Sequence, residues 1–68
     1  MSTPTVGWIG LGAMGWPMAG HLHAQGMLKA VWNRSADKAK GFVDQHPHTT
    51  LAADPVALAG EVDVVVMC

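Results

Sequence analysis

Apolar residues in this chain occur in short runs separated by glycine, proline and small polar residues. Three of these runs are rich in β-branched or aromatic side chains, which favour extended backbone in a buried sheet, and the Thr-Thr-Leu segment is a further, brief extended piece. We expect strands at Thr5–Ile9, Leu28–Trp32, Thr49–Leu51 and Val62–Cys68. The last run is mostly valine, a composition typical of a strand that is buried on both faces.

A different period follows the first strand. Met14, Met18 and Leu22 recur every fourth residue, and the small residues Gly15 and Ala19 lie on nearly the same face. Spacings of three and four residues place side chains on one side of a helix. The pattern therefore predicts a helix.

The ends of this helix are indicated by proline and glycine. Pro17 is tolerated only in the first turn, where its missing N–H has no intrahelical partner to lose, so we expect the helix to begin near Ala13 or Met14. Gly26 supplies the C-terminal stop.

Two further helices are predicted by their capping residues. Ser35 is a good N-cap for a helix that ends before His46-Pro47-His48. The apolar positions of this helix are Ala36, Ala39, Phe42 and Val43. Asp54 followed by Pro55 predicts the start of a short third helix, which runs through Leu58 and stops at Gly60.

Strands and helices thus alternate as β-α-β-α-β-α-β with short connections. This order predicts an α/β fold with a parallel, doubly wound sheet and right-handed crossovers, with the four strands in the order 3-2-1-4. The Val62–Cys68 strand would then form an open edge beside the first strand. Because an apolar edge normally needs a covering element, we expect residues 1–68 to be the first part of one larger domain, and to self-associate if the chain ends there.

Composition narrows the classes of function. Half of the 68 residues are apolar, the formal net charge is −1, and Cys68 is the single cysteine, so no intramolecular disulfide forms and a reducing cytoplasm is expected. Residues 1–5 lack the features of a secretory signal, and no apolar run is long enough to cross a membrane. Four lysines and arginines are too few to coat a nucleic acid.

Residues Gly10–Gly15 read Gly-Leu-Gly-Ala-Met-Gly, which fits the pattern Gly-x-Gly-x-x-Gly between a predicted strand and a predicted helix. In this setting Gly10 takes the tight turn, Gly12 lets a diphosphate approach the backbone, and Gly15 allows close packing of helix on sheet. The N–H groups of Ala13 and Met14, at a helix N-terminus, would face the anion. We predict a dinucleotide site formed by Gly10, Leu11, Gly12, Ala13, Met14 and Gly15; the alternative is that the glycines only shape a tight turn.

The end of the second predicted strand bears on the choice of cofactor. NAD-selective domains usually carry a carboxylate there for the ribose hydroxyls, whereas this chain has Asn33-Arg34-Ser35. We expect Asn33, Arg34 and Ser35 to contact the cofactor. A guanidinium can bind a 2′-phosphate by a bidentate, charge-assisted contact, which favours NADP over NAD. Alternatively, Arg34 is a solvated cation or stacks on adenine in an NAD enzyme, and Ser35 is a plain helix cap. Met67 and Cys68, at the carboxyl end of the last strand, are further candidate cofactor contacts.

Other conspicuous residues favour structural roles. His21 and His23 diverge on a helix and are expected to face solvent, and no carboxylate or thiolate stands at ligand spacing from His46 or His48, so we predict no metal site. We expect Cys68 to be a small buried residue. The methionines are expected to fill the core, and Trp8 and Trp16 to pack rather than bind.

The segment Val6–Ala19, with its Gly-Leu-Gly-x-Met-Gly core followed by Met-Ala, resembles the N-terminal signature of the β-hydroxyacid dehydrogenases. Val31–Ser35 and Asp63–Cys68 resemble later segments of the same cofactor domain, so the resemblance covers nearly the whole chain. Met27–Lys29 departs from the family pattern, which makes the start of the second strand less defined.

The resemblance implies a Rossmann-type NADP-binding domain of an oxidoreductase that interconverts a small hydroxyacid and its aldehyde or keto acid, as in 3-hydroxyisobutyrate dehydrogenase. In that family a lysine beyond the cofactor domain is the general acid or base, and a helical domain completes the site and forms the dimer. We therefore assign no catalytic residue within residues 1–68 and expect a homo-oligomer. The 6-phosphogluconate dehydrogenases and imine reductases begin similarly; a non-catalytic NAD(P)-sensing module and an inactive remnant are the alternatives.

Overall fold

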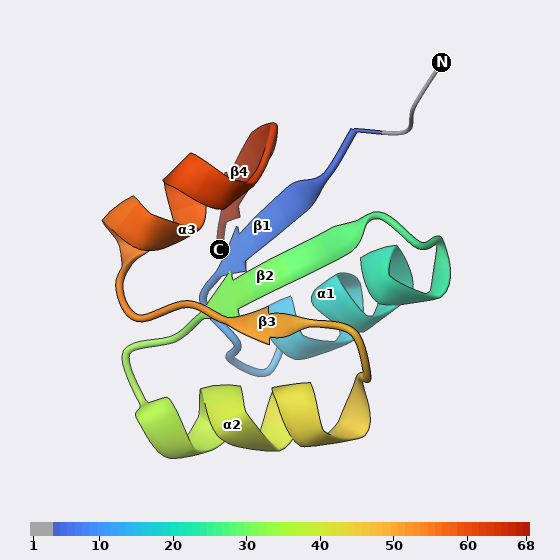
Figure 1. Cartoon of the computed structure of the whole chain (residues 1–68). Coiled ribbons are helices and arrows are strands. Elements are labelled where there is room, and N and C mark those ends of the chain that lie inside the picture. The colour runs from blue at the N-terminus through green and yellow to red at the C-terminus, as the bar shows by residue number, and fades with distance from the viewer. Residues whose placement is uncertain (1–3) are drawn as a thin grey trace.

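A computed structural model describes residues 4–68. The sequence analysis expects no secretory signal at residues 1–5, and the first three of these lie outside the described part. The elements follow the predicted order β-α-β-α-β-α-β. Their bounds are β1 Val6–Ile9, α1 Gly15–Ala24, β2 Leu28–Trp32, α2 Ala36–Gln45, β3 Thr50–Leu51, α3 Pro55–Glu61 and β4 Val64–Met67. All strand pairs are parallel, and the sheet order is β3-β2-β1-β4, which confirms the expected topology (Figure 1).

Helices cover both faces of the sheet. One core cluster joins β1 and β2 to α1 and α2, with Phe42 and Leu11 at its centre. A smaller cluster on the other face is formed by Ala30, Ala52 and Leu58, beneath α3. Figure 1 shows the three carboxyl ends of β1, β2 and β4 meeting at one edge, with the chain's C-terminus beside them.

Helix α1 packs on the sheet through the small residues of its predicted apolar face and not through its methionines. Gly15 and Ala19 are buried against the sheet, whereas Met14 and Met18 are 75% and 51% exposed. Small side chains allow the helix axis to come close to the strands, and the longer methionines then extend past the contact. The expectation that the methionines fill the core is wrong for these two and for Met67, which is also exposed.

Helix ends agree with the predictions to within one residue. Helix α1 begins at Gly15, with Met14 in the N-cap position, and Gly26 beyond its end has a φ of 75°. In α3 the Asp54 carboxylate accepts a hydrogen bond of 2.7 Å from the Ala57 N–H, as expected of a cap, but the helix continues past Gly60 to Glu61. Thus Gly60 does not end it.

Strand ends also shift slightly. Strand β1 starts at Val6, one residue later than predicted. The Thr5 carbonyl accepts from the N–H groups of both Asp63 and Val64, and the Thr5 N–H donates to the Asp63 carboxylate at 3.0 Å. Strand β2 has the predicted bounds, and β3 lacks Thr49. The register between β1 and β2 shifts once, between Val6, which pairs with Leu28, and Gly7, which pairs with Ala30.

Strand β4 is shorter and more exposed than expected. It spans Val64–Met67 and pairs only with β1, so within residues 4–68 it lies at the edge of the sheet. Val64 is 46% exposed and Met67 is 77% exposed. The expectations of a strand buried on both faces and of a buried Cys68 are therefore wrong in this structure, where Cys68 is exposed as well.

The histidines divide into two groups. His21 is exposed, as expected. His23 is partly buried instead: its Nε2 donates to the carbonyl oxygen of Pro47 at 2.8 Å, and its ring lies 5.0 Å from that of His46. His46 in turn stacks on Phe42. These rings join α1 to the end of α2, which is a packing role.

Candidate cofactor-binding site

The turn after β1 is fixed by main-chain geometry. Gly10 has a φ of 102°, in the region that L side chains rarely adopt, and its N–H donates to the Trp32 carbonyl at 3.0 Å. The Gly10 carbonyl accepts from the indole Nε1 of buried Trp8 at 2.8 Å. The turn expected at Gly10 is confirmed, and Trp8 holds it in place from within the core.

The start of α1 lies directly against this turn. A Cβ atom added at Gly15 would overlap the carbonyl oxygen of Gly10 and come within 3.2 Å of Trp8 Nε1. Neither neighbour can move without breaking the hydrogen bond between them. The expected close packing at Gly15 is therefore confirmed, and it brings the N-terminus of α1 to the carboxyl edge of the sheet.

Between these two glycines the chain opens to solvent. Gly12 is exposed, and a Cβ atom at this position would meet nothing within 4 Å. Within residues 4–68, the N–H groups of Gly12, Ala13 and Met14 donate to no protein acceptor. Helix α1 has no side-chain cap and no acidic residue in its first turn. Unpaired donors at the positive end of a helix dipole favour a bound anion, so this loop can accept a diphosphate.

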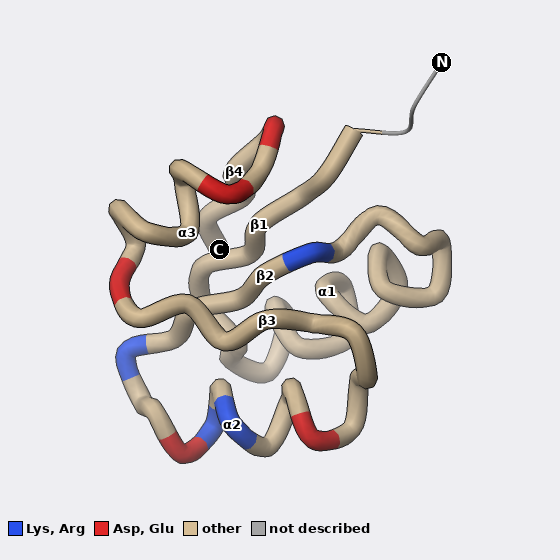
Figure 2. Tube along the Cα trace, viewed as in Figure 1, with Lys and Arg blue, Asp and Glu red and all other residues tan. Residues whose placement is uncertain are grey.

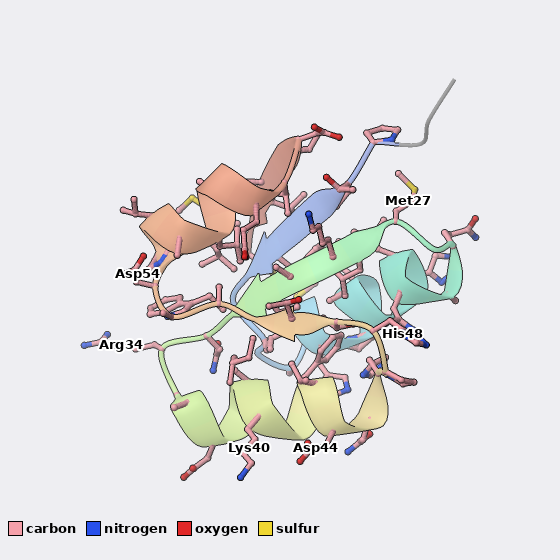
Figure 3. All side chains as sticks on the ribbon, viewed as in Figure 1. Met27, Arg34, Lys40, Asp44, His48 and Asp54 are labelled. Carbon is pink, nitrogen blue, oxygen red and sulfur yellow. The ribbon has the colours of Figure 1, made fainter. Side chains whose placement is uncertain are left out.

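The loop between β2 and α2 runs beside the glycine loop. The Asn33 Oδ1 accepts from the Leu11 N–H at 2.8 Å, and the Asn33 Nδ2 donates to the Ser35 carbonyl at 3.1 Å. Arg34 is exposed, and Figure 3 shows its side chain extending outward from the end of β2, away from α2 and α3. Ser35 occupies the N-cap position of α2, but its side chain makes no capping bond.

The last residues of the chain reach the same edge. The Cys68 N–H donates to the Ile9 carbonyl at 2.9 Å, and Met67 pairs with Ile9 in the sheet. A Cβ atom at Gly10 would lie 2.5 Å from the Cys68 oxygen. The structure thus brings Met67 and Cys68 beside the glycine turn, where the sequence placed candidate contacts.

Charges are distributed unevenly around this site. Figure 2 shows that β1, the glycine loop and α1 carry no lysine, arginine or carboxylate, and the first such residue in the sequence is Lys29. At the carboxyl edge, Arg34 and Asp54 come from two successive loops (Figure 3), and the Asp54 carboxylate is engaged in capping α3. No carboxylate therefore lies in the glycine loop to repel a phosphate.

Two contacts of the site were not foreseen from the sequence. Trp8 was expected only to pack, yet its N–H positions the Gly10 carbonyl. Asn33 was expected to touch a cofactor, yet both ends of its amide bind the protein itself. A buried indole N–H normally needs an acceptor, and this rule could have predicted that Trp8 finds one. The bond between Leu11 and Asn33 joins residues 22 apart in the sequence, and no local pattern predicts it.

Two other classes of site are not seen in the described part of the chain. Residues 4–68 contain no group of three or more His, Cys, Asp or Glu side chains placed to hold a metal ion. In the same range, no helix combines the length and the apolar character needed to span a bilayer.

The parallel sheet in the order 3-2-1-4, the glycine-rich turn after β1 and the open N-terminus of α1 together define a Rossmann-type dinucleotide-binding domain. Residues 5–68 match the family described as the NAD binding domain of 6-phosphogluconate dehydrogenase. The chain belongs to this family of NAD(P)-binding domains.

Similar proteins are oxidoreductases by name. The chain is 43% identical over 63 residues to an uncharacterized oxidoreductase of Shewanella frigidimarina, covering 93% of this chain and 21% of the relative. It is 39% identical over 64 residues to a probable mitochondrial 3-hydroxyisobutyrate dehydrogenase-like protein of Arabidopsis thaliana, covering 94% of this chain and 19% of the relative. The chain thus spans about a fifth of the length of these relatives.

A solved structure shares the fold. The reductive aminase from Aspergillus terreus, in complex with NADPH and ethyl-5-oxohexanoate, matches with a TM-score of 0.80 and 37% sequence identity. The match covers 98% of this chain and 23% of the aminase. The resemblance to the β-hydroxyacid dehydrogenases, inferred from the segments Val6–Ala19, Val31–Ser35 and Asp63–Cys68, is therefore confirmed at the level of family and fold.

Proposed function

We propose that this chain is the NADP(H)-binding part of an oxidoreductase that interconverts a small hydroxyacid and its aldehyde or keto acid. The observation that carries the proposal is a pair of adjoining loops at the carboxyl edge, each of which has groups suited to bind an anion. The glycine loop offers free N–H groups, and Arg34 offers an exposed guanidinium one strand away. A dinucleotide with a 2′-phosphate has anionic groups for both sites.

The residues of the glycine loop fit this cofactor. The diphosphate of the cofactor would lie over Gly12, where no side chain intervenes. It would accept hydrogen bonds from the Ala13 and Met14 N–H groups. Arg34, with Asn33 and Ser35 shaping its loop, would bind the 2′-phosphate. Gly10, Leu11 and Gly15 hold the loop in place, and Met67 and Cys68 border it. When bound, the nicotinamide supplies or accepts a hydride.

The substrate class is supported by the similarity to a 3-hydroxyisobutyrate dehydrogenase-like protein. Reduction of a C=N bond is the second candidate, and the similarity to a reductive aminase that was solved with NADPH favours it. In either case we propose that the catalytic acid or base lies outside residues 1–68, and that the complete enzyme acts as a homo-oligomer on a small molecule.

Titration of the chain with NADPH and with NADH tests the cofactor. We expect saturable binding of both, with NADPH the tighter ligand. Arg34→Ala should weaken NADPH binding by about 10-fold or more, because hydrogen bonds to charged groups contribute about 1.5–3 kcal/mol, and should change NADH binding little.

Lys40→Ala is the matched control for Arg34→Ala. It removes one positive charge from exposed Lys40 on α2, whose side chain lies away from the loop in Figure 3, so it should leave both affinities unchanged. Equal weakening of NADPH and NADH by Arg34→Ala would contradict the NADP preference. Absence of binding by either dinucleotide would contradict the function.

A further inference from the structure

The two loops of the site are joined at the point where their strands part. Strands β1 and β2 pair as far as Ile9 and Trp32, and the Gly10 N–H still donates to the Trp32 carbonyl at 3.0 Å. Beyond this point the next N–H, that of Leu11, finds no main-chain carbonyl of β2. It donates instead to the side-chain Oδ1 of Asn33 at 2.8 Å. The asparagine therefore extends the pairing by one position after the backbones diverge.

The other end of the same amide holds the second loop. The Asn33 Nδ2 donates to the carbonyl oxygen of Ser35 at 3.1 Å, and this oxygen also accepts the Ala39 N–H of α2 at 3.2 Å. Arg34 lies between two residues that are thereby fixed, so its exposed side chain leaves the surface from an anchored main chain.

The two partners of Asn33 require opposite roles of its side chain. The Leu11 N–H needs an acceptor, and the Ser35 carbonyl needs a donor, so a carboxamide of this length serves both. Aspartate could serve only the first partner, because its ionised carboxylate cannot donate. Apolar side chains could serve neither, and the N–H of Leu11, which is fully buried, would be left unpaired at a cost.

We propose that Asn33 is a positioning residue that couples the diphosphate loop to the 2′-phosphate loop, so that the N–H groups of the glycine loop and the Arg34 guanidinium are held at one separation. This inference rests on the proposed function for its ligand, but the amide brace itself is a property of the chain alone. Asn33 acts through Leu11 and Arg34, and not through a contact of its own with the cofactor.

Amide hydrogen exchange in the free chain tests the brace. In Asn33→Ala, exchange at the Leu11 N–H should accelerate by about 5- to 10-fold, the equivalent of one net hydrogen bond, while exchange at Val31 in the core of β2 stays unchanged. Asn33→Asp should keep the protection of Leu11, because its carboxylate still accepts. Unchanged exchange at Leu11 in Asn33→Ala, or acceleration at Leu11 and Val31 alike, would overturn the brace.

Ser35→Ala is the matched control. The bond from Asn33 goes to the Ser35 main-chain carbonyl, and the Ser35 side chain makes no capping bond, so this variant should exchange like the unaltered chain. Accelerated exchange at Leu11 in Ser35→Ala would mean that any change in this loop loosens the glycine loop, and would overturn a specific role for Asn33.

A double-mutant cycle with NADPH tests the coupling. We expect Asn33→Ala to weaken NADPH binding by about 10-fold in the unaltered chain and by clearly less in an Arg34→Ala background, because residues that act through one another are non-additive. Additive losses would overturn the coupling. If the chain binds neither NADPH nor NADH while the exchange results hold, the brace is supported and the proposed function fails. If the chain binds NADPH and Asn33→Ala does not weaken that binding, the coupling is overturned and the proposed function stands.

Discussion

The glycine loop, residues 10–15, and the β2–α2 loop, residues 33–35, lie side by side but use different parts of the chain. The glycine loop is defined by backbone: Gly10 needs a positive φ, and Gly15 has no room for a Cβ atom. The β2–α2 loop is defined by side chains, since Asn33 makes two hydrogen bonds and Arg34 projects into solvent. A diphosphate is common to NAD and NADP, whereas the 2′-phosphate is not. The glycine loop, which the backbone fixes, therefore suits the diphosphate that both cofactors share. The β2–α2 loop, whose side chains substitution can change, suits the 2′-phosphate that distinguishes NADP.

Gly15→Ala should have the largest effect on this comparison. The added Cβ atom would overlap the Gly10 carbonyl, which is already held by Trp8. We expect a loss of about 3 kcal/mol in the free energy of unfolding, the upper part of the range for overpacking, despite the gain of about 1 kcal/mol in helix propensity. Urea denaturation measures it, and Gly60→Ala, at an open helical position, is the control. Equal stability of the two variants would show that the loop is not sterically fixed.

Gly12→Ala separates binding from folding. Its Cβ atom would meet nothing in the protein, so the unfolding free energy should change by less than about 0.5 kcal/mol. The same atom would occupy the space proposed for the diphosphate, and we expect NADPH and NADH to bind about 10- to 30-fold more weakly, or about 1.4–2 kcal/mol. Calorimetric titration measures both affinities. A variant that binds both cofactors normally would show that the diphosphate does not lie over Gly12.

Ser35→Ala should have the smallest effect on stability. Ser35 is at the N-cap of α2 but makes no side-chain capping bond, so the usual loss of about 1 kcal/mol for a cap should not appear. Asp54→Ala, which removes a real cap with a 2.7 Å bond, should show that loss. Thermal unfolding of the two variants gives the comparison. A loss in Ser35→Ala as large as that in Asp54→Ala would show that the serine caps α2 in solution.

The sequence alone predicted the order of the elements, the strand order and the turn at Gly10. The elements and the turn depend on neighbouring residues: β-branched runs, apolar residues at every fourth position, and a glycine pattern between strand and helix. The strand order followed from the usual arrangement of a doubly wound sheet with this order of elements. The candidate cofactor residues followed from the glycine pattern and from their places at the carboxyl ends of predicted strands. The structure gathers them at one edge of the sheet, and their binding roles stay predictions.

What the sequence could not predict is which apolar residues are covered and which acceptor each donor finds. Strands β2 and β4 are both strongly apolar, yet β2 pairs on both sides and is buried at Ala30 and Val31, while β4 pairs with β1 alone and leaves Val64 exposed. Composition sets the tendency to form a strand, but burial depends on neighbours supplied by distant segments.

The same reason applies to the site. The bond from Leu11 to Asn33 spans 22 residues, and it exists only because parallel pairing of β1 and β2 brings their carboxyl ends together. Local propensity acts over a few residues and determined the elements of this protein. Contacts between elements were decided by the tertiary structure, because a side chain can bond only to groups that the packed sheet and helices place within its reach.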